Sequence, residues 1–482
     1  MGTPHFLTLW VMVFCWCKLP AQEQLGMRLS NYAGVNSLSL NPAGHLSSPM
    51  KWDINLVGGG IFFENNYAFI QNTSTGKLLR SGDDAEYVLA NDLEGRAPRG
   101  AHVVDFFDNG RRRFLHAYTF VNGPSFAFKV QDKHAFGVFT RFMARASAQR
   151  VPDVYSYYRY NNRAFFDVFA VSPFDGAAMS WSEVALNYAL KLPAYDGSFG
   201  LGINLRFLQG YEGGYLLNEG TMQHTKLPDD VITLSRIEGR FGYASSNLEG
   251  GGPQFRRNGS GVALDLGVIR LIGETDDGYR LRLGASLLDL GSVRFNKNAA
   301  DHRVGTDGTA TLRMDDYTVF DRPEHLPGLA SKFSTDVLGS SSATLQGDAF
   351  RLALPAALSL QADYSISPVI YLNGLLLQRF VNGNAGLKRG NLLAFTPRFE
   401  HRWFGASLPL SVYQWQAARV GLALRLGVLV IGTDDLLSWT GSRRYTGTDV
   451  YFALKIHPFD LDLGNGKGKR KGRKGRVRCY DF

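Results

Sequence analysis

The sequence contains only three cysteines, and none of its apolar runs is long enough to cross a bilayer as a helix. Cys15 and Cys17 lie near the N-terminus, so only Cys479 would remain after removal of an N-terminal leader. A chain with one cysteine can form neither an internal disulfide nor a cysteine-based zinc cluster. A helical span needs about 18 or more consecutive apolar residues, so the sequence excludes helical membrane spans.

Signatures of catalysis and metal binding are also missing. The ten histidines are scattered without the His-x-x-x-His spacing of zinc enzymes, and no Gly-x-Ser-x-Gly nucleophile elbow occurs. We therefore expect no catalytic residues, no cofactor and no metal. An enzyme ranks behind the two functions considered below.

Positive charge is concentrated at the C-terminus. Eight basic residues and one acid lie in the last 16 positions, whereas the net charge of the whole chain is +9. The body is therefore nearly neutral, which argues against nucleic acid as a partner. Glycines interrupt the basic run and like charges repel, so residues 460–482 are predicted to form an extended tail. Its candidate docking residues are Lys467, Lys469, Arg470, Lys471, Arg473, Lys474, Arg476, Arg478 and Phe482.

The N-terminus has the pattern of a secretory leader. Residues 6–16 are apolar over the length of an h-region, and Ala21 offers a small residue for cleavage. No basic residue precedes the apolar stretch and Lys18 follows it, so a buried N-terminal helix is the alternative. We predict a signal peptide over residues 1–21 and export from the cytoplasm.

Two-residue alternation is the main signal in the body of the chain. Within residues 184–192 and 199–207, apolar side chains occupy every second position and small or polar ones the others. Asp196 and Gly197 stand between the two runs, which predicts a β-hairpin. Each run has the length of a tilted transmembrane strand.

The same alternation recurs often enough for about 14 strands. Short connections near residues 132, 195, 276, 367, 405 and 433 alternate with long ones over 71–112, 149–177, 209–258 and 292–351, as in outer-membrane barrels. Lipid offers no partner to an open sheet edge, so such a sheet must close. The predicted strands are 52–70, 113–130, 135–148, 178–192, 198–208, 259–272, 279–291, 352–365, 369–381, 392–403, 406–413, 418–431, 435–441 and 448–457.

These observations predict an all-β fold: a closed antiparallel transmembrane β-barrel over residues 51–459, in the bacterial outer membrane. The even number of strands places both termini in the periplasm. The long connections then form external loops. Asp434 and Asp435 are expected in a periplasmic turn rather than in a metal site.

Charged residues on the polar face of the strands are candidates for the lumen. Arg206, Arg280 and Arg282 share that face, where they need acidic partners or water. Asp265, on a neighbouring strand, is the expected partner of one of them. A structural network is favoured over a substrate path.

Residues 31–49 carry an Asn-Pro-Ala motif at Asn41, Pro42 and Ala43. The segment resembles the N-terminal hatch of the long-chain fatty-acid transporter and toluene-channel family. Asn41 could cap a helical turn with Pro42 at its first position, a role that positions a plug as readily as it binds a ligand.

Two further segments, residues 281–295 and 424–436, resemble a Bacteroidota-type branch of such barrels, and the resemblance covers most of residues 27–457. It implies a 14-stranded barrel with a small hatch over residues 22–50 inside the lumen. In that family the hatch and a lateral opening move hydrophobic molecules across the outer membrane. The ligand-contacting residues of the family have no recognisable counterparts in this sequence.

Two functions remain open at this point. The first is a channel or transporter for hydrophobic small molecules, with outer-membrane lipid around it and a hydrophobic ligand inside. The second is a non-transporting barrel subunit of an outer-membrane secretion or assembly complex, docked through its basic C-terminal tail onto a periplasmic or outer-membrane protein. The tail could equally serve solubility alone.

Overall fold

The computed structural model describes residues 23–82, 85–93, 95–249, 254–274, 278–318, 322–380, 385–441 and 444–456. The predicted signal peptide and the predicted basic tail with its docking candidates lie outside these residues. In the part that is described, no helix has the length and apolar character needed to cross a membrane.

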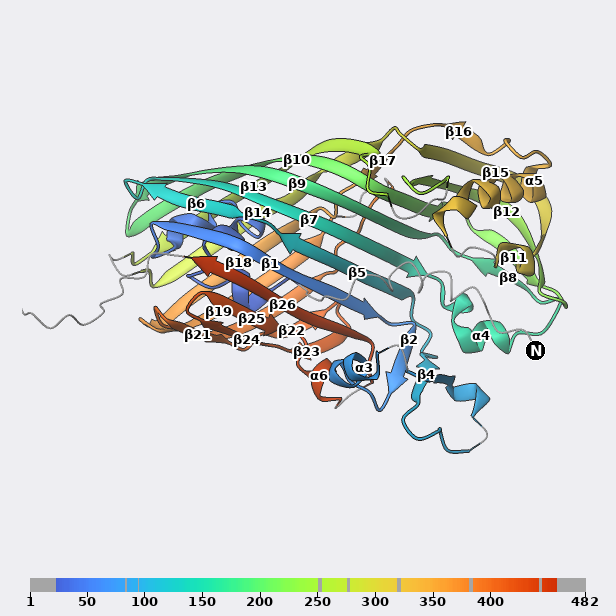
Figure 1. Cartoon of the computed structure of the whole chain (residues 1–482), viewed down its shortest axis with the longest axis horizontal. Helices are drawn as coiled ribbons and strands as arrows, with labels where there is room; N and C mark the ends of the chain where they lie inside the picture. The colour runs from blue at the N-terminus through green and yellow to red at the C-terminus, as the bar shows by residue number, and fades with distance from the viewer. Residues whose placement is uncertain are drawn as a thin grey trace, which may run out of the picture.

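Fourteen antiparallel strands form a closed barrel, as predicted (Figure 1). β1 pairs with β26 on one side, from Ile54 opposite Ile456 to Glu64 opposite Gly447, and with β5 and β6 on the other. Because the first strand pairs with the last, the barrel sheet closes on itself. The strands are β1 (Trp52–Asn65), β5 with β6 (Arg113–Asn122, Ser125–Val130), β7 (His134–Val151), β9 (Phe174–Ala194), β10 (Gly197–Asn218), β13 (Gly259–Ile272), β14 (Leu281–Phe295), β17 with β18 (Phe350–Ala353, Ala357–Ser367), β19 (Ile370–Arg379), β20 (Leu392–Glu400), β21 with β22 (Phe404–Ser407, Leu410–Tyr413), β23 with β24 (Ala417–Val420, Leu422–Leu426), β25 (Leu429–Thr433) and β26 (Gly447–Ile456).

The outer wall is apolar, and the inner wall carries polar, small and buried apolar side chains. On β10, five apolar side chains from Phe199 to Phe207 are 40–48% exposed. Asn204 and Arg206 alternate with them and are almost fully buried inside the barrel. A wall with apolar side chains at every outward position is suited to lipid, so the barrel is a transmembrane one.

The connections between strands differ in length between the two ends of the barrel. β1 begins and β26 ends at the same end, where the connections between strands are short; we call it the short-turn end. The opposite, long-loop end carries the longer connections predicted from the sequence, together with a short turn between β22 and β23.

One predicted strand is wrong. The thirteenth strand is β25, Leu429–Thr433, and not residues 435–441. Gly427, with a φ of +56°, makes the turn from β24 into β25 within the span predicted as one strand. Asp434 and Asp435 are therefore not in a periplasmic turn: they follow β25 inside the barrel and are at most 1% exposed.

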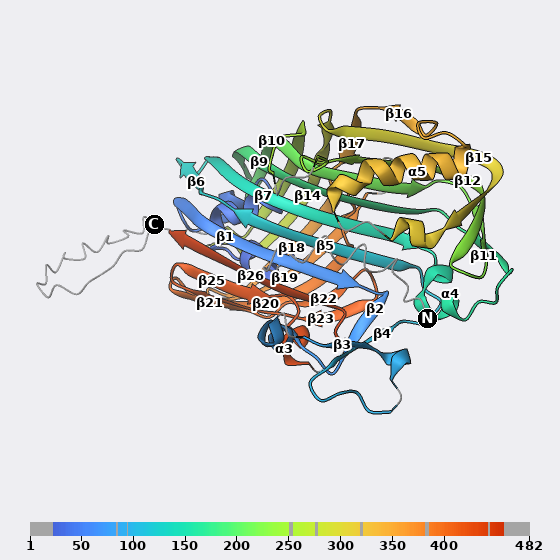
Figure 2. The ribbon, with the colours of Figure 1, turned by 45° about the vertical axis from the view of Figure 1, so that its right-hand side comes forward.

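Additional elements stand at the long-loop end (Figure 2). β10 runs beyond its pairing with β13 and pairs there with β12, which pairs in turn with β15, so the same sheet extends past the barrel. These elements are β2 (Ala68–Gln71), α3 (Thr75–Ser81), β3 (Tyr87–Leu89), β4 (His102–Phe106), α4 (Tyr157–Asn161), β8 (Val168–Val171), β11 (Met222–Lys226), β12 (Val231–Ala244), β15 (Ala299–Arg313), α5 (Leu326–Leu338), β16 (Leu345–Gly347) and α6 (Leu437–Thr440).

Residues 23–50, which we call the N-terminal segment, lie inside the barrel towards its short-turn end (Figure 1, dark blue). The segment consists of the short helix α2 (Leu25–Arg28) and two 3-10 helices, Gly34–Ser39 and Gly44–Ser47. Most of its side chains are buried. It therefore occupies part of the space that the strands enclose.

Candidate functional site in the barrel lumen

The first half of the N-terminal segment is held by acidic and phenolic groups of the barrel wall. The backbone N–H of Leu25 donates to Asp434 at 3.1 Å, and that of Gly26 donates to the Tyr451 hydroxyl at 3.1 Å. Further along, backbone N–H groups of the segment donate to the carboxylates of Glu400 and Asp53. These bonds satisfy backbone donors that would otherwise be buried without partners.

The Asn-Pro-Ala motif is hydrogen-bonded to two strands of the wall. The Asn41 amide donates to the carbonyl of Val268 on β13 at 3.1 Å, while its oxygen accepts from the Ala43 N–H at 3.0 Å. Asn187, on β9, donates to the Pro42 carbonyl at 2.9 Å. The 3-10 helix begins only at Gly44, so Asn41 closes a turn ahead of the helix and Pro42 is not its first residue.

Glycines of the wall allow this motif to approach the strands closely. A Cβ on Gly202 of β10 would lie 2.4 Å from the Pro42 carbonyl carbon, and one on Gly267 of β13 would lie 2.3 Å from the Asn41 oxygen. Glycine within a strand commonly marks such a close approach of another backbone. The lumen surface is therefore shaped to the N-terminal segment at these positions.

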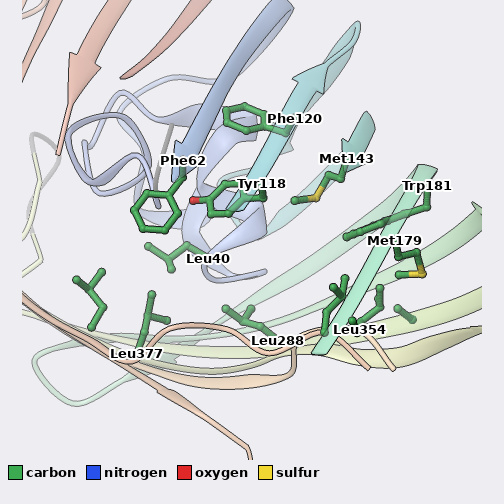
Figure 3. Packing of buried hydrophobic residues seen from close by; sticks show 14 of the residues in the cluster. Leu40, Phe62, Tyr118, Phe120, Met143, Met179, Trp181, Leu288, Leu354 and Leu377 are labelled. Atoms are coloured by element: carbon green, nitrogen blue, oxygen red, sulfur yellow. The ribbon is translucent and has the colours of Figure 1, made fainter. Parts of the chain in front are cut away.

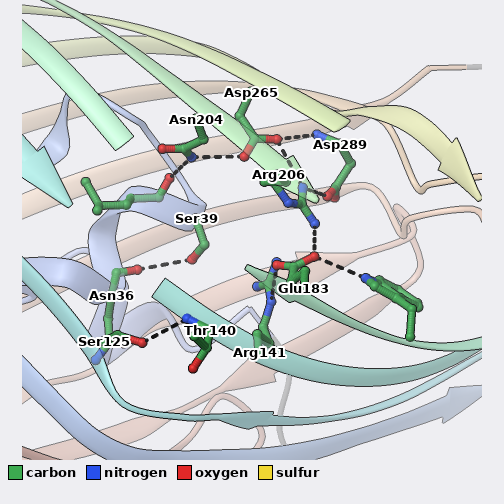
Figure 4. Close-up of polar contacts among 12 residues, drawn as sticks. Asn36, Ser39, Ser125, Thr140, Arg141, Glu183, Asn204, Arg206, Asp265 and Asp289 are labelled. Carbon is green, nitrogen blue, oxygen red and sulfur yellow. Dashed lines mark hydrogen bonds and ion pairs between the residues drawn. The ribbon is translucent and has the colours of Figure 1, made fainter. Parts of the chain in front are cut away.

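A buried ionic network crosses the lumen beside the segment (Figure 4). Arg206 of β10 contacts Glu183 of β9 at 2.6 Å, Asp265 of β13 at 3.2 Å, and Asp289 of β14. Asp289 also pairs with Arg389 at 2.9 Å. All five side chains are at most 8% exposed, so each charge depends on these partners rather than on water.

The lumen candidates named from the sequence divide into two groups. Arg206 and Asp265 meet in this network, and Arg282 pairs with Asp363 at 2.9 Å. Arg280 was placed wrongly, because it is exposed. β14 begins only at Leu281, so the alternation does not extend back through residues 279 and 280.

Several charged residues of the lumen were missed. Arg398 of β20 is fully buried and pairs with Asp363 at 2.8 Å and Glu400 at 3.0 Å. Alternation on β20 would have found both Arg398 and Glu400, since they share a face opposite to Phe399. Arg389 lies in the connection between β19 and β20, where no periodic signal could identify it.

The interior also holds a large apolar cluster (Figure 3). Rings and aliphatic chains from many strands point inward and pack on Leu40 and on the first helix of the N-terminal segment. The labelled members are Leu40, Phe62, Tyr118, Phe120, Met143, Met179, Trp181, Leu288, Leu354 and Leu377. Porin lumens are polar and filled with water, so an apolar interior of this size sets the barrel apart from a porin.

His45 is the buried titratable group of the second half of the N-terminal segment. It is 1% exposed, and neither ring nitrogen has a hydrogen-bond partner among the described residues. Burial, together with the ammonium groups of Lys129 and Lys455, lowers the pKa of His45 to about 3. The imidazole is therefore neutral at physiological pH.

No group of His, Cys, Asp and Glu side chains among the described residues is arranged to hold a metal ion. The buried acids of the lumen contact arginines, lysine or backbone N–H groups instead. The described side chains of the lumen interact with one another by apolar packing and by ion pairs.

The model of a family of unknown function, DUF5723, matches residues 42–434. The chain belongs to this family. The matched region of this DUF5723 member starts at Pro42 of the lumen motif and continues through β25. Among curated proteins, none matches its sequence.

Solved structures similar to this DUF5723 member include outer-membrane proteins at low identity. A deltaS2S3 mutant of the monoaromatic hydrocarbon channel TodX is 9% identical over 88% of this chain and 94% of that chain, with a TM-score of 0.38. The toluene transporter TbuX of Ralstonia pickettii is 9% identical with the same coverage and a TM-score of 0.31. A FadL homologue of Pseudomonas aeruginosa is 10% identical over 91% and 97%, with a TM-score of 0.25. These similarities are too distant to assign a function.

Proposed function

We propose that the chain is an outer-membrane channel for hydrophobic small molecules and that the N-terminal segment is its hatch. The apolar cluster inside the barrel carries this proposal. Trp181, Met179 and Leu377 belong to a continuous apolar surface that includes Leu25 and Met27 of the segment. A hydrophobic molecule that enters the lumen would make apolar contacts in place of those between the segment and the wall.

The way in which the N-terminal segment is held supports a hatch. Its contacts with the barrel combine hydrogen bonds, as from Asn187 to Pro42, with apolar packing and an ion pair between Glu23 and Arg389 at 3.5 Å. No disulfide can fix it to the wall, since the sequence has no cysteine between Cys17 and Cys479. A neutral hydrogen bond is worth about 1 kcal/mol and one to a carboxylate about 1.5–3 kcal/mol, so the bonds can be exchanged a few at a time as the segment shifts.

We infer the orientation of the barrel in the membrane from the lengths of its connections. The described chain enters and leaves the barrel at the short-turn end, and long connections between strands occur at the other. In outer-membrane barrels the short turns face the periplasm. We therefore place both termini, the hatch and the basic tail on the periplasmic side.

Uptake of a hydrophobic fluorescent probe by cells producing the protein tests the channel. Leu377→Gln puts a polar group into the apolar interior, and we expect it to reduce uptake several-fold. Leu345→Gln, at a side chain 49% exposed on β16, is the matched control. Heat-dependent gel mobility shows that each variant has formed its barrel.

The alternative function gives the opposite result. A non-transporting subunit of a secretion or assembly complex would show the same probe uptake with and without Leu377→Gln. Deletion of residues 467–482 would then remove co-purified proteins. A channel keeps its uptake when these residues are deleted.

A further inference from the structure

A groove lies on the outer wall of the barrel at the short-turn end. It is a shallow, open depression with a volume of about 580 Å³. β1 and β6 form it, because their register places Trp52 opposite Phe128 and Ile54 opposite Phe126. Its lining residues are Lys51, Trp52, Ile54, Phe126, Phe128 and Lys129.

The floor of the groove is aromatic and continues on the neighbouring strand. The rings of Phe126 and Phe128 stack with centroids 5.3 Å apart, and Phe128 stacks on Phe136 of β7 at 5.4 Å. Phe136 in turn lies 5.2 Å from the ring of Tyr188 on β9. The groove is therefore one edge of an aromatic band on the lipid-facing surface, of the kind found at membrane–water interfaces.

Positive charge borders the groove at its rim. Lys51 is exposed and immediately precedes Trp52. The Lys129 ammonium group donates to the Ser48 carbonyl at 2.7 Å and lies 3.6 Å from Asp132. Lys133, in the same turn, is exposed. Lys51 thus places an exposed ammonium group at the outer end of an apolar groove that faces the membrane, whereas the Lys129 ammonium group is bonded inside the barrel.

We propose that this groove binds one anionic phospholipid of the surrounding membrane. Lys51 contacts its phosphate, and an acyl chain lies along Ile54 and Phe126 towards the middle of the bilayer. An anionic lipid fits better than a zwitterionic one, because the latter carries its own cation beside the phosphate and gains less from the lysine.

Native mass spectrometry of the full-length protein tests this site with phosphatidylglycerol and phosphatidylcholine as probes. We expect the wild type to retain one phosphatidylglycerol and to bind phosphatidylcholine at least tenfold more weakly. Lys51→Glu reverses the charge at the rim and should weaken phosphatidylglycerol binding about tenfold. Lys77→Glu, on the exposed helix α3, is the matched control and should leave it unchanged.

Quenching of tryptophan fluorescence by lipid with brominated acyl chains locates the bound molecule. Brominated phosphatidylglycerol should quench the wild type more than the Trp52→Phe variant, and this difference should disappear in the presence of Lys51→Glu. The proposal is overturned if the two lipids bind equally, or if Lys51→Glu and Lys77→Glu behave alike. It is also overturned if Trp52→Phe leaves the quenching unchanged. None of these readouts depends on whether the barrel conducts.

Discussion

The side-chain amide of Asn187, on β9, donates a hydrogen bond of 2.9 Å to the carbonyl of Pro42 in the lumen motif. The same amide donates to Asn204 on β10 at 2.8 Å. The motif is therefore tied to the wall at the point where two adjacent strands meet. Its carbonyl is buried there without access to water.

Asn187→Ala should loosen the N-terminal segment. Loss of the bond leaves the Pro42 carbonyl unsatisfied, at a cost of roughly 1–3 kcal/mol. Hydrogen exchange at residues 38–48 should therefore become faster. Asn373→Ala is the control, because Asn373 is equally buried and its amide has no hydrogen-bond partner in the described part of the chain. Equal exchange in the two variants would contradict a role for Asn187 in holding the segment.

Gly202→Val should open the lumen by displacing the motif. A Cβ at this position would lie 2.4 Å from both the Ala43 nitrogen and the Pro42 carbonyl carbon, so the segment has to move. We expect uptake of a hydrophobic probe to rise several-fold. Gly305→Val on β15 is the control, since a Cβ there meets no atom within 4 Å. If both variants take up the probe at the wild-type rate, the segment does not close the path.

Arg206→Met should destabilise the barrel strongly. It leaves the carboxylates of Glu183, Asp265 and Asp289 without their shared cation, and breaking a buried ion pair costs about 3–5 kcal/mol. Denaturant unfolding of the protein refolded into detergent measures the loss. Arg280→Met, at an exposed side chain, should change the free energy of unfolding by less than about 0.5 kcal/mol. Similar losses for the two arginines would be inconsistent with the network described.

Acidification should weaken the packing of the N-terminal segment through His45. The pKa of His45 lies at about 3 in the folded protein, below its unfolded value of about 6.5. Its contribution is therefore complete above pH 6.5 and is lost as the pH falls towards 3, by about 1 kcal/mol at pH 5.5. Thermal unfolding at pH 7.5 and 5.5 measures this, and His45→Leu should lose less stability between the two values than the wild type. An unchanged pH dependence in the variant would show that His45 does not titrate in this range.

The barrel could be predicted because its strands obey a rule that acts at every position. A lipid-facing wall requires apolar side chains at alternate residues, as from Phe199 to Phe207, and this requirement is visible in the sequence. The rule fails where a strand is short. β25 has five residues, and the turn at Gly427 interrupts what looks like one alternating run, so the sequence predicts the next strand at 435–441 whereas it lies at 429–433.

The lumen site was only partly predictable, because pairing across the barrel depends on closure. Arg206 and Asp265 lie on neighbouring strands, so their ion pair could be expected from alternation alone. Arg389 reaches Asp289 from a connection about 100 residues away in sequence, and no local pattern encodes that contact. Likewise, the sequence does not show why position 202 is glycine, because the reason is the close approach of Pro42 in the folded barrel.

A reversible lock on the N-terminal segment tests the central claim most directly. The side chains of Asn36 in the segment and Asn55 on β1 touch, with the Asn36 amide 3.3 Å from the Asn55 oxygen. The pair Asn36→Cys and Asn55→Cys, in a Cys479→Ser background, should join the segment to the wall when oxidised. We expect uptake of a hydrophobic probe to stop in the oxidised protein and to return on reduction. Equal uptake in both states would show that the segment is a fixed part of the barrel and not its hatch.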